Sequence, residues 1–264
     1  MRYFLHLGFN GSKYHGWQFQ PEVVTVQETI ETELKRIFKQ KITAFGCGRT
    51  DAGVHASQYY AHINLDQSLD FDLKFRLNKN LPDDISVYQV LEVTKDQHAR
   101  YDATFRTYDY FIHLTKDALL SNCSSFYQLD KLNLDAMNKA VKLVLRQQDF
   151  KALCRRPHIY KHTLCEVTNA ALFTNKATDR LRFTITANRF LHGMIRIIVY
   201  YLLQIGTGRL SIVEFDKILQ GERNEKRKRL AKPNGLYLSR IEYPYFENEP
   251  RHHPGGSLLL DLEP

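Results

Sequence analysis

The sequence lacks the cysteine pattern of a protein stabilised by disulfides or zinc. Its four cysteines, Cys47, Cys123, Cys154 and Cys165, form no CxxC pair. We recognise no secretory signal before them, so we expect reduced thiols in a cytoplasmic protein. A chain of 264 residues with 43% hydrophobic content is long enough to bury a core without such staples.

A hydrophobic run long enough to cross a membrane is also missing. The longest apolar run, residues 190–205, is shorter than the roughly 20 residues that a membrane helix needs, and it carries Arg196 near its centre. We interpret this run as a core helix and expect no membrane association.

Acidic residues are too few to balance the basic ones. The chain has 29 Asp and Glu against 37 Lys and Arg, which gives a net charge of +8 and indicates a polyanionic partner. Two segments are candidate contacts, although each also fits an ordinary solvated surface: residues 222–232, and the group Arg155, Arg156, His158 and Lys161 around the aromatic Tyr160.

The most informative motif is GRTDAGVHA, residues 48–56. Gly48 and Gly53 flank Asp51 and favour a sharp turn that presents this carboxylate, and Arg49 suits a phosphate. An isolated Asp-Ala-Gly is typical of a polar turn between strands. The whole motif, however, resembles the catalytic loop of the TruA family of tRNA pseudouridine synthases, and the resemblance implies that Asp51 is essential.

The resemblance extends over nearly the whole chain. It is carried by GSKYHGWQ (11–18), NLPDDI (80–85), HARYDA (98–103), ANRFLHGMIR (187–196) and GLYL (235–238). Two segments depart from the family pattern. Asn10 stands where aspartate is frequent, and KHTLCEV (161–167) lacks the usual Thr-Arg, which affects the expected RNA contacts of that region.

Sequence patterns predict most elements of a mixed α+β fold. The first half is expected to contain a strand at 3–9, a helix from a Thr25–Glu28 capping box to about Gln40, and strands at 42–46, 57–65 and 85–93. Residues 69–81 fit both an alternating strand and a helical face; the family resemblance implies a helix.

The second half shows a similar order of elements. We expect a strand at 105–115, a helix after Asn133, strands at 165–174 and 181–188, helices at 190–205 and after Ser211, and a strand at 235–243. Both halves approximate β-α-β-β-α-β, the ferredoxin-like order. We therefore predict two such halves, 1–103 and 104–243, side by side around a central RNA-binding cleft, with a tail at 244–264.

Arg196 and Tyr108 complete the predicted catalytic set. An arginine within an apolar run is expensive to bury unless an anion meets it or it reaches the surface along its stem. The resemblance implies an ion pair between Arg196 and Asp51. Tyr108 shares a strand face with Arg106 and Tyr110; by resemblance Tyr108 stacks on the target uracil and serves as a possible base, whereas Tyr110 is structural.

The resemblance implies a homodimeric enzyme that converts uridine to pseudouridine on the 3′ side of the tRNA anticodon stem and loop, at tRNA positions 38–40, after flipping the base out. No cofactor and no metal are implied. Sequence leaves Asp51 as nucleophile at C1′, adduct former at C6 or base at C2′. The predicted RNA-binding residues are Arg49, Thr50, His55, Tyr108, Arg155, Arg156 and Lys161.

Two alternatives remain at this stage. The first is a catalytically silent RNA-binding module or tRNA-folding chaperone of the same fold. The second is a metal-assisted hydrolase that uses Asp51 and His55, although these residues show no recognised ligand spacing.

Overall fold

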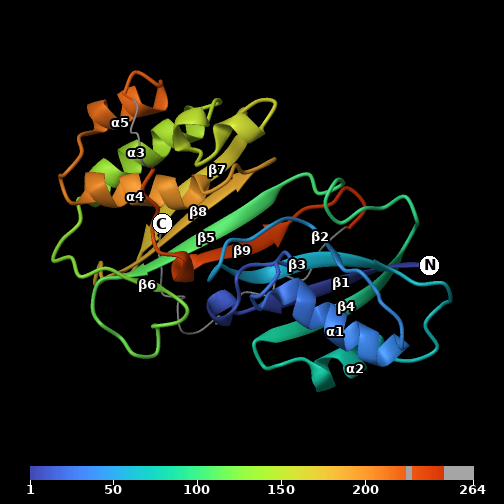
Figure 1. The fold of residues 1–264 in the computed structure, drawn as a ribbon. Coiled ribbons are helices and arrows are strands. Elements are labelled where there is room, and N and C mark those ends of the chain that lie inside the picture. Colours follow the sequence, from blue (N-terminus) through green and yellow to red (C-terminus); the bar gives the residue numbers. More distant parts are fainter. Residues whose placement is uncertain (224–227, 247–264) are drawn as a thin grey trace. The chain divides into compact units, whose positions relative to one another are not determined.

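The computed structural model describes residues 1–223 and 228–246. The centre of the basic stretch 222–232 and the tail beyond residue 246 lie outside the described residues. Within the described part, contacts group the chain into two compact units: residues 1–104 with 237–246, and residues 105–236 (Figure 1).

The first unit is a sheet covered by two helices. Its elements are β1 (Arg2–Phe9), η1 (Gly11–Lys13), α1 (Val26–Phe38), β2 (Phe45–Gly46), β3 (His55–Asn64), α2 (Leu73–Asn80) and β4 (Ile85–Val93). The strand order is β4-β1-β3, with antiparallel pairing, and the short β2 also pairs with β3. Both helices lie on one face of this sheet (Figure 1).

Local signals place these helices where the sequence predicts them. The Thr25 side chain accepts a hydrogen bond from the Glu28 amide (3.3 Å) and begins α1, whose residues Ile30 and Leu34 are fully buried. Asp72 caps α2 in the same way, through the Phe75 amide (2.9 Å). The ambiguous segment 69–81 therefore contains a helix, because a capped turn satisfies amides that a strand edge would leave open.

The described residues of the second unit form four strands and three α-helices. Its elements are β5 (Arg106–His113), β6 (Ser125–Phe126), α3 (Leu134–Arg146), η2 (Lys151–Leu153), η3 (Pro157–Ile159), β7 (Val167–Thr174), β8 (Arg180–Ala187), α4 (Met194–Gly206), α5 (Ile212–Leu219) and η4 (Pro233–Gly235). The sheet runs β5-β8-β7 with antiparallel pairing, and β6 pairs with β5 in parallel. The predicted mixed α/β class is confirmed.

Two expectations differ from the structure. The helix predicted from residue 190 begins at Met194, because Gly193 adopts a left-handed φ of 73° that a continuous helix does not allow. The last strand, β9 (Leu236–Ile241), falls within the predicted second half, 104–243, yet residues from Tyr237 onward group with the first unit. The reason is long-range: β9 pairs in parallel with β3 through Tyr237 and Leu238, and the Ile241 amide donates to the Gln58 side chain (2.7 Å).

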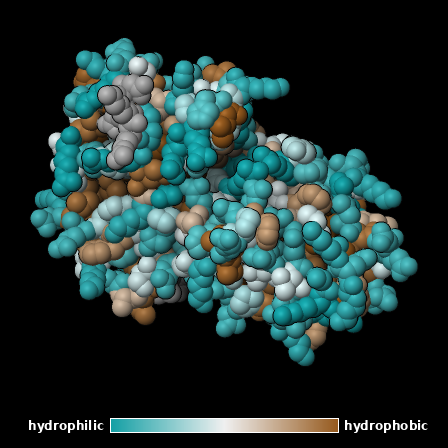
Figure 2. Space-filling view, in the orientation of Figure 1, coloured by the Kyte–Doolittle hydropathy of each residue, from teal (hydrophilic) through white to brown (hydrophobic). Residues whose placement is uncertain are grey.

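The surface in Figure 2 is mostly hydrophilic, with hydrophobic residues in small patches rather than one broad band. Among the residues that the structure describes, no helix is both long enough and apolar enough to span a bilayer.

Candidate active site

Asp51 lies in the loop that leads from β2 into β3. The Asp51 carbonyl accepts a hydrogen bond from the Val54 amide (3.2 Å), which closes a turn around the half-buried aspartate. Gly53, at φ 75°, supplies the left-handed residue of this turn. Gly53 thus has the local role that the sequence indicated, whereas Gly48 has no left-handed φ and a Cβ atom there would meet no other atom within 4 Å.

The preceding segment, residues 11–17, packs against the Asp51 loop. Residue 16 is a glycine at φ 86°, and a Cβ atom there would collide with the Thr50 carbonyl oxygen. The Gly53 amide donates to the Tyr14 carbonyl (3.1 Å). Because backbone packs directly on backbone, the Asp51 loop has little room to shift relative to the segment 11–17.

The segment 11–17 is anchored in turn. The Asn10 side chain accepts from the Ser12 amide (3.1 Å) and caps η1, so asparagine fulfils locally the capping role of an aspartate. The Tyr14 hydroxyl donates to the Asp84 carboxylate. Burial, together with this hydrogen bond and the charge of Asp84, raises the pKa of Tyr14 above its usual range, so Tyr14 stays protonated.

His55 serves the fold of the loop. Its side chain is 1% exposed; its Nδ1 accepts a hydrogen bond from the Gly11 amide (3.0 Å), and its ring stacks on Tyr237 at 4.5 Å between centroids. This burial argues against the RNA contact that the sequence predicted for His55, because the ring offers no surface to a ligand.

Arg49 and Thr50 differ in their surroundings. Arg49 is exposed and makes no hydrogen bond or ion pair with other described residues. The hydroxyl of Thr50 is buried without a hydrogen-bond partner in the described part of the chain. Arg49 is therefore the residue of this pair that is available to RNA.

In the second unit, β5 positions Tyr108. The residue is half-buried opposite Ile185 of β8, and its ring meets Phe190 edge to face at 5.1 Å. Alternation along β5 puts Tyr110 on the same face, where it is fully buried. The two tyrosines of one strand face thus have different environments: Tyr108 is partly exposed, whereas Tyr110 is fully buried.

Arg196 lies in the first turn of α4 and is half-buried. Its Nε donates to the Ala231 carbonyl (2.8 Å), and the Ala231 amide donates back to the Arg196 carbonyl (2.9 Å). This reciprocal pair orients the guanidinium plane relative to the 231–235 segment.

Tyr110 holds the same segment. Its hydroxyl donates to the Lys232 carbonyl (2.7 Å) and contacts Ser125 Oγ (2.9 Å) and the Tyr127 hydroxyl (3.0 Å). Burial raises the pKa of Tyr110 well above its ordinary value, and Tyr127 adds to the effect, so Tyr110 does not ionise near neutral pH. A chain of contacts runs from Tyr110 through residues 231–232 to Arg196, and the sequence pattern alone did not show it.

The basic group around Tyr160 is a structured loop. Arg155, Arg156 and Lys161 are exposed, whereas the Tyr160 hydroxyl accepts from the His192 amide (3.0 Å). The guanidinium of Arg189 lies 5.5 Å from the Tyr160 ring centre. Sequence reasoning missed Arg189, because only the fold brings the turn before α4 against this loop. Tyr160 is thereby a packing residue, with the cations around it.

No group of three or more His, Cys, Asp or Glu within residues 1–223 and 228–246 is arranged to hold a metal ion. The four cysteines are free thiols.

Comparisons with known proteins identify relatives. A family model described as tRNA pseudouridine synthase matches residues 140–244. The tRNA pseudouridine synthase A of Porphyromonas gingivalis is 38% identical over 246 residues, which cover 92% of this chain and 97% of that protein. That of Bacteroides fragilis is 39% identical with 92% and 96% coverage, and that of Caldicellulosiruptor bescii is 36% identical with 90% and 98% coverage.

Proposed function

Since this chain belongs to the tRNA pseudouridine synthase A family, it is an isomerase that acts on uridine in tRNA, and we propose that Asp51 is its catalytic carboxylate. The observation that carries the assignment is the loop geometry: a half-buried aspartate in a turn that the 11–17 segment clamps by direct backbone contact. A carboxylate held in this way loses little conformational freedom when substrate binds, which favours reaction.

The reaction breaks the bond between uracil N1 and ribose C1′, rotates the uracil and forms a bond from C5 to C1′. Atoms are conserved and no redox change occurs, so the protein has to supply positioning, a nucleophile or base, and proton transfer. Asp51 serves as the group that attacks or deprotonates the nucleotide. Tyr108, which is only half-buried, serves as the face on which the extruded uracil stacks.

Arg196 is the proposed counter-ion of Asp51. Arg196 is half-buried in the first turn of α4, and the hydrogen bond from its Nε to the Ala231 carbonyl orients the guanidinium, which favours a carboxylate partner. Such a pair would orient the Asp51 carboxylate. The pairing, and with it the arrangement of two ferredoxin-like halves around a shared cleft, is part of the proposal.

The substrate region that we propose is the anticodon arm, with uridines on the 3′ side of its stem and loop as targets. Arg49, next to the catalytic turn, fills the vacated stack or holds the displaced phosphate. The exposed Arg155, Arg156 and Lys161 hold the RNA backbone. A homodimer that acts in the cytoplasm, where tRNA matures, completes this proposal.

The test is Asp51→Asn, measured as pseudouridine formed in an unmodified anticodon-arm transcript. We expect no product, while tRNA affinity falls by less than about tenfold, because phosphate contacts dominate binding. Arg196→Met should be nearly as inactive, and the double variant should be no worse than either single variant, since the two side chains act as one unit. If the activity losses of the two single variants multiply in the double variant, the pairing of Asp51 with Arg196 is contradicted. If Asp51→Asn loses tRNA affinity as severely as it loses activity, the role of Asp51 is structural.

A further inference from the structure

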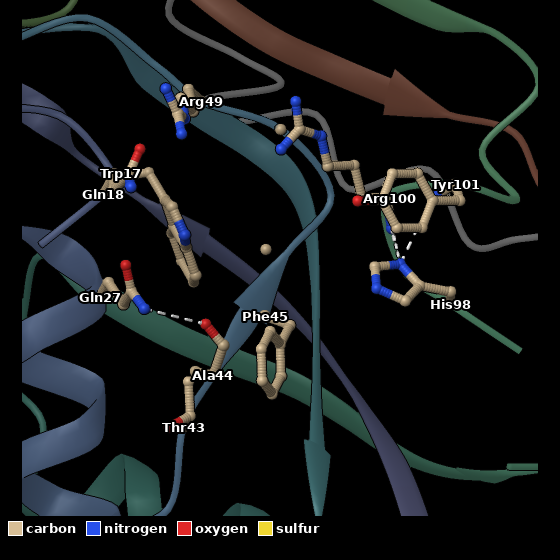
Figure 3. Close-up of a pocket in the computed structure, with 12 residues that line it drawn as sticks. Trp17, Gln18, Gln27, Thr43, Ala44, Phe45, Arg49, His98, Arg100 and Tyr101 are labelled. Atoms are coloured by element: carbon tan, nitrogen blue, oxygen red, sulfur yellow. Dashed lines mark hydrogen bonds between the residues drawn. The ribbon is translucent and has the colours of Figure 1, made fainter.

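A pocket lies in the first unit, and of the residues assigned above to the reaction or to RNA binding it includes Arg49 (Figure 3). Four segments form it: residues 17–18 after η1, Gln27 of α1, residues 43–49 around β2, and residues 98–101. Its volume is about 220 Å³. An apolar cavity of about 150 Å³ admits benzene, and sites for drug-sized ligands begin near 300 Å³. The pocket therefore fits one aromatic heterocycle.

Aromatic side chains supply its walls. Phe45 is 45% exposed although His62 stacks against it at 4.9 Å, and Tyr101 is 77% exposed beside His98 at 4.3 Å. Trp17 is 2% exposed and is held by stacking on Tyr59 at 4.2 Å. Exposed aromatic rings supported from behind are the usual platform for a nucleobase, because every base has a π-face.

Two arginine side chains also line this pocket. Arg49 and Arg100 are both exposed and both line it (Figure 3), and none of the twelve lining residues is acidic. The guanidinium of Arg100 lies 6.0 Å from the Tyr101 ring centre. Aromatic walls with an arginine rim favour an aromatic ligand that carries negative charge, such as a nucleotide.

The pocket is also close to the reacting residue along the chain. Gly48 lines it and is three residues from Asp51, so their Cα atoms are at most about 11 Å apart. A stacked strand rises about 3.4 Å per nucleotide, so this distance corresponds to at most about three nucleotides.

We propose that this pocket is a subsite for one unpaired base of the RNA substrate, within about three nucleotides of the target uridine. The base stacks on Phe45 and Tyr101, and Arg49 and Arg100 hold the adjoining phosphates. The inference rests on the proposed function, and it adds a recognition element: substrates that offer an unpaired base at the right spacing gain affinity from the pocket.

The experiment pairs protein variants with altered RNA. Unmodified anticodon-arm RNAs, each abasic at one position within three nucleotides of the target, are titrated against the wild-type protein, Phe45→Ala and Tyr101→Ala. We expect one abasic position to weaken wild-type binding by roughly 5- to 150-fold, as expected for loss of a base–aromatic stack. Phe45→Ala and Tyr101→Ala should bind intact RNA more weakly than the wild-type protein does. Their affinity should not fall further when the base at that same position is removed.

Phe75→Ala is the matched control, because Phe75 is 62% exposed in the same unit and does not line the pocket. Phe75→Ala should bind intact RNA with wild-type affinity and should lose affinity at the same abasic position as the wild-type protein. Since Phe45 stacks on His62, its replacement also perturbs packing, whereas Tyr101 is exposed enough that Tyr101→Ala tests the ligand contact by itself.

The proposal fails if Tyr101→Ala loses as much affinity as the wild-type protein at every abasic position. It also fails if the pocket binds a free nucleoside monophosphate but not a base of the RNA. Wild-type protein that binds these RNAs but forms no pseudouridine would refute the proposed function instead. The two failures are therefore distinguishable.

Discussion

Removing one buried hydroxyl in the second unit should reduce both stability and turnover. In Tyr110→Phe the ring stays in place, but the Lys232 carbonyl loses its donor at 2.7 Å. The other two groups that contact the Tyr110 hydroxyl retain hydrogen bonds of their own: Ser125 Oγ donates to Asn234, and the Tyr127 hydroxyl accepts from the Lys232 amide. One carbonyl left unsatisfied costs about 1–3 kcal/mol, so we expect a loss of about 2 kcal/mol.

In a domain of this size such a loss lowers Tm by about 4–8 °C. Turnover should fall as well, because the Lys232 carbonyl is next to the Ala231 carbonyl that holds Arg196 Nε. Affinity for tRNA should stay the same, since Tyr110 is fully buried. The assays are denaturant unfolding, single-turnover pseudouridine formation and tRNA titration.

Tyr200→Phe in α4 is the control, because the Tyr200 hydroxyl makes no hydrogen bond with other described residues. It should behave as wild type in all three assays. A Tyr110→Phe protein with a stability change below about 0.5 kcal/mol and undiminished turnover would refute the argument that Tyr110 positions Arg196.

Three further outcomes are expected. Tyr108→Phe should keep stacking and lose only the hydroxyl, whereas Tyr108→Leu should lose both. If Tyr108→Phe is active and Tyr108→Leu is inactive, the role of Tyr108 is stacking; if both variants are inactive, the hydroxyl takes part in the chemistry. The logarithm of tRNA affinity should fall linearly with the logarithm of salt concentration, and Lys161→Gln should flatten the slope by about one contact; affinity indifferent to salt between about 50 and 200 mM would contradict phosphate recognition. Burial, with the charges of His98 and Arg2, lowers the pKa of His62 to about 4 from 6.5. The unfolded chain therefore binds more protons between these values, and the free energy of unfolding should decrease as pH falls from 6.5 to 4, by at most about 3 kcal/mol; an equally steep profile in His62→Gln would show that another group is responsible.

Several elements follow from residues that are neighbours in sequence. Thr25 caps a helix through an amide three residues away, and Ser211 forms a complete capping box with Glu214. The turn at Asp51 depends on glycine conformation in the same way. Such features are readable from sequence because the interacting groups are adjacent in the chain.

Other features depend on contacts between distant residues. The pairing of β9 with β3 joins positions about 180 residues apart in sequence, and no local pattern in β9 specifies its partner. The burial of His55 and the contact of Tyr110 with Lys232 likewise require the folded chain.

The sequence by itself determined the GRTDAGVHA motif that carries the family resemblance, the helices with strong caps and the basic charge, because each depends on residue type and short spacing. Only the tertiary structure decided which motif residues keep exposed surface, and that Trp17, Phe45, Arg49 and Tyr101 line one pocket. The physical reason is that burial and pocket formation are properties of many segments packed together, and a side chain's chemical type does not reveal which distant segment will cover it.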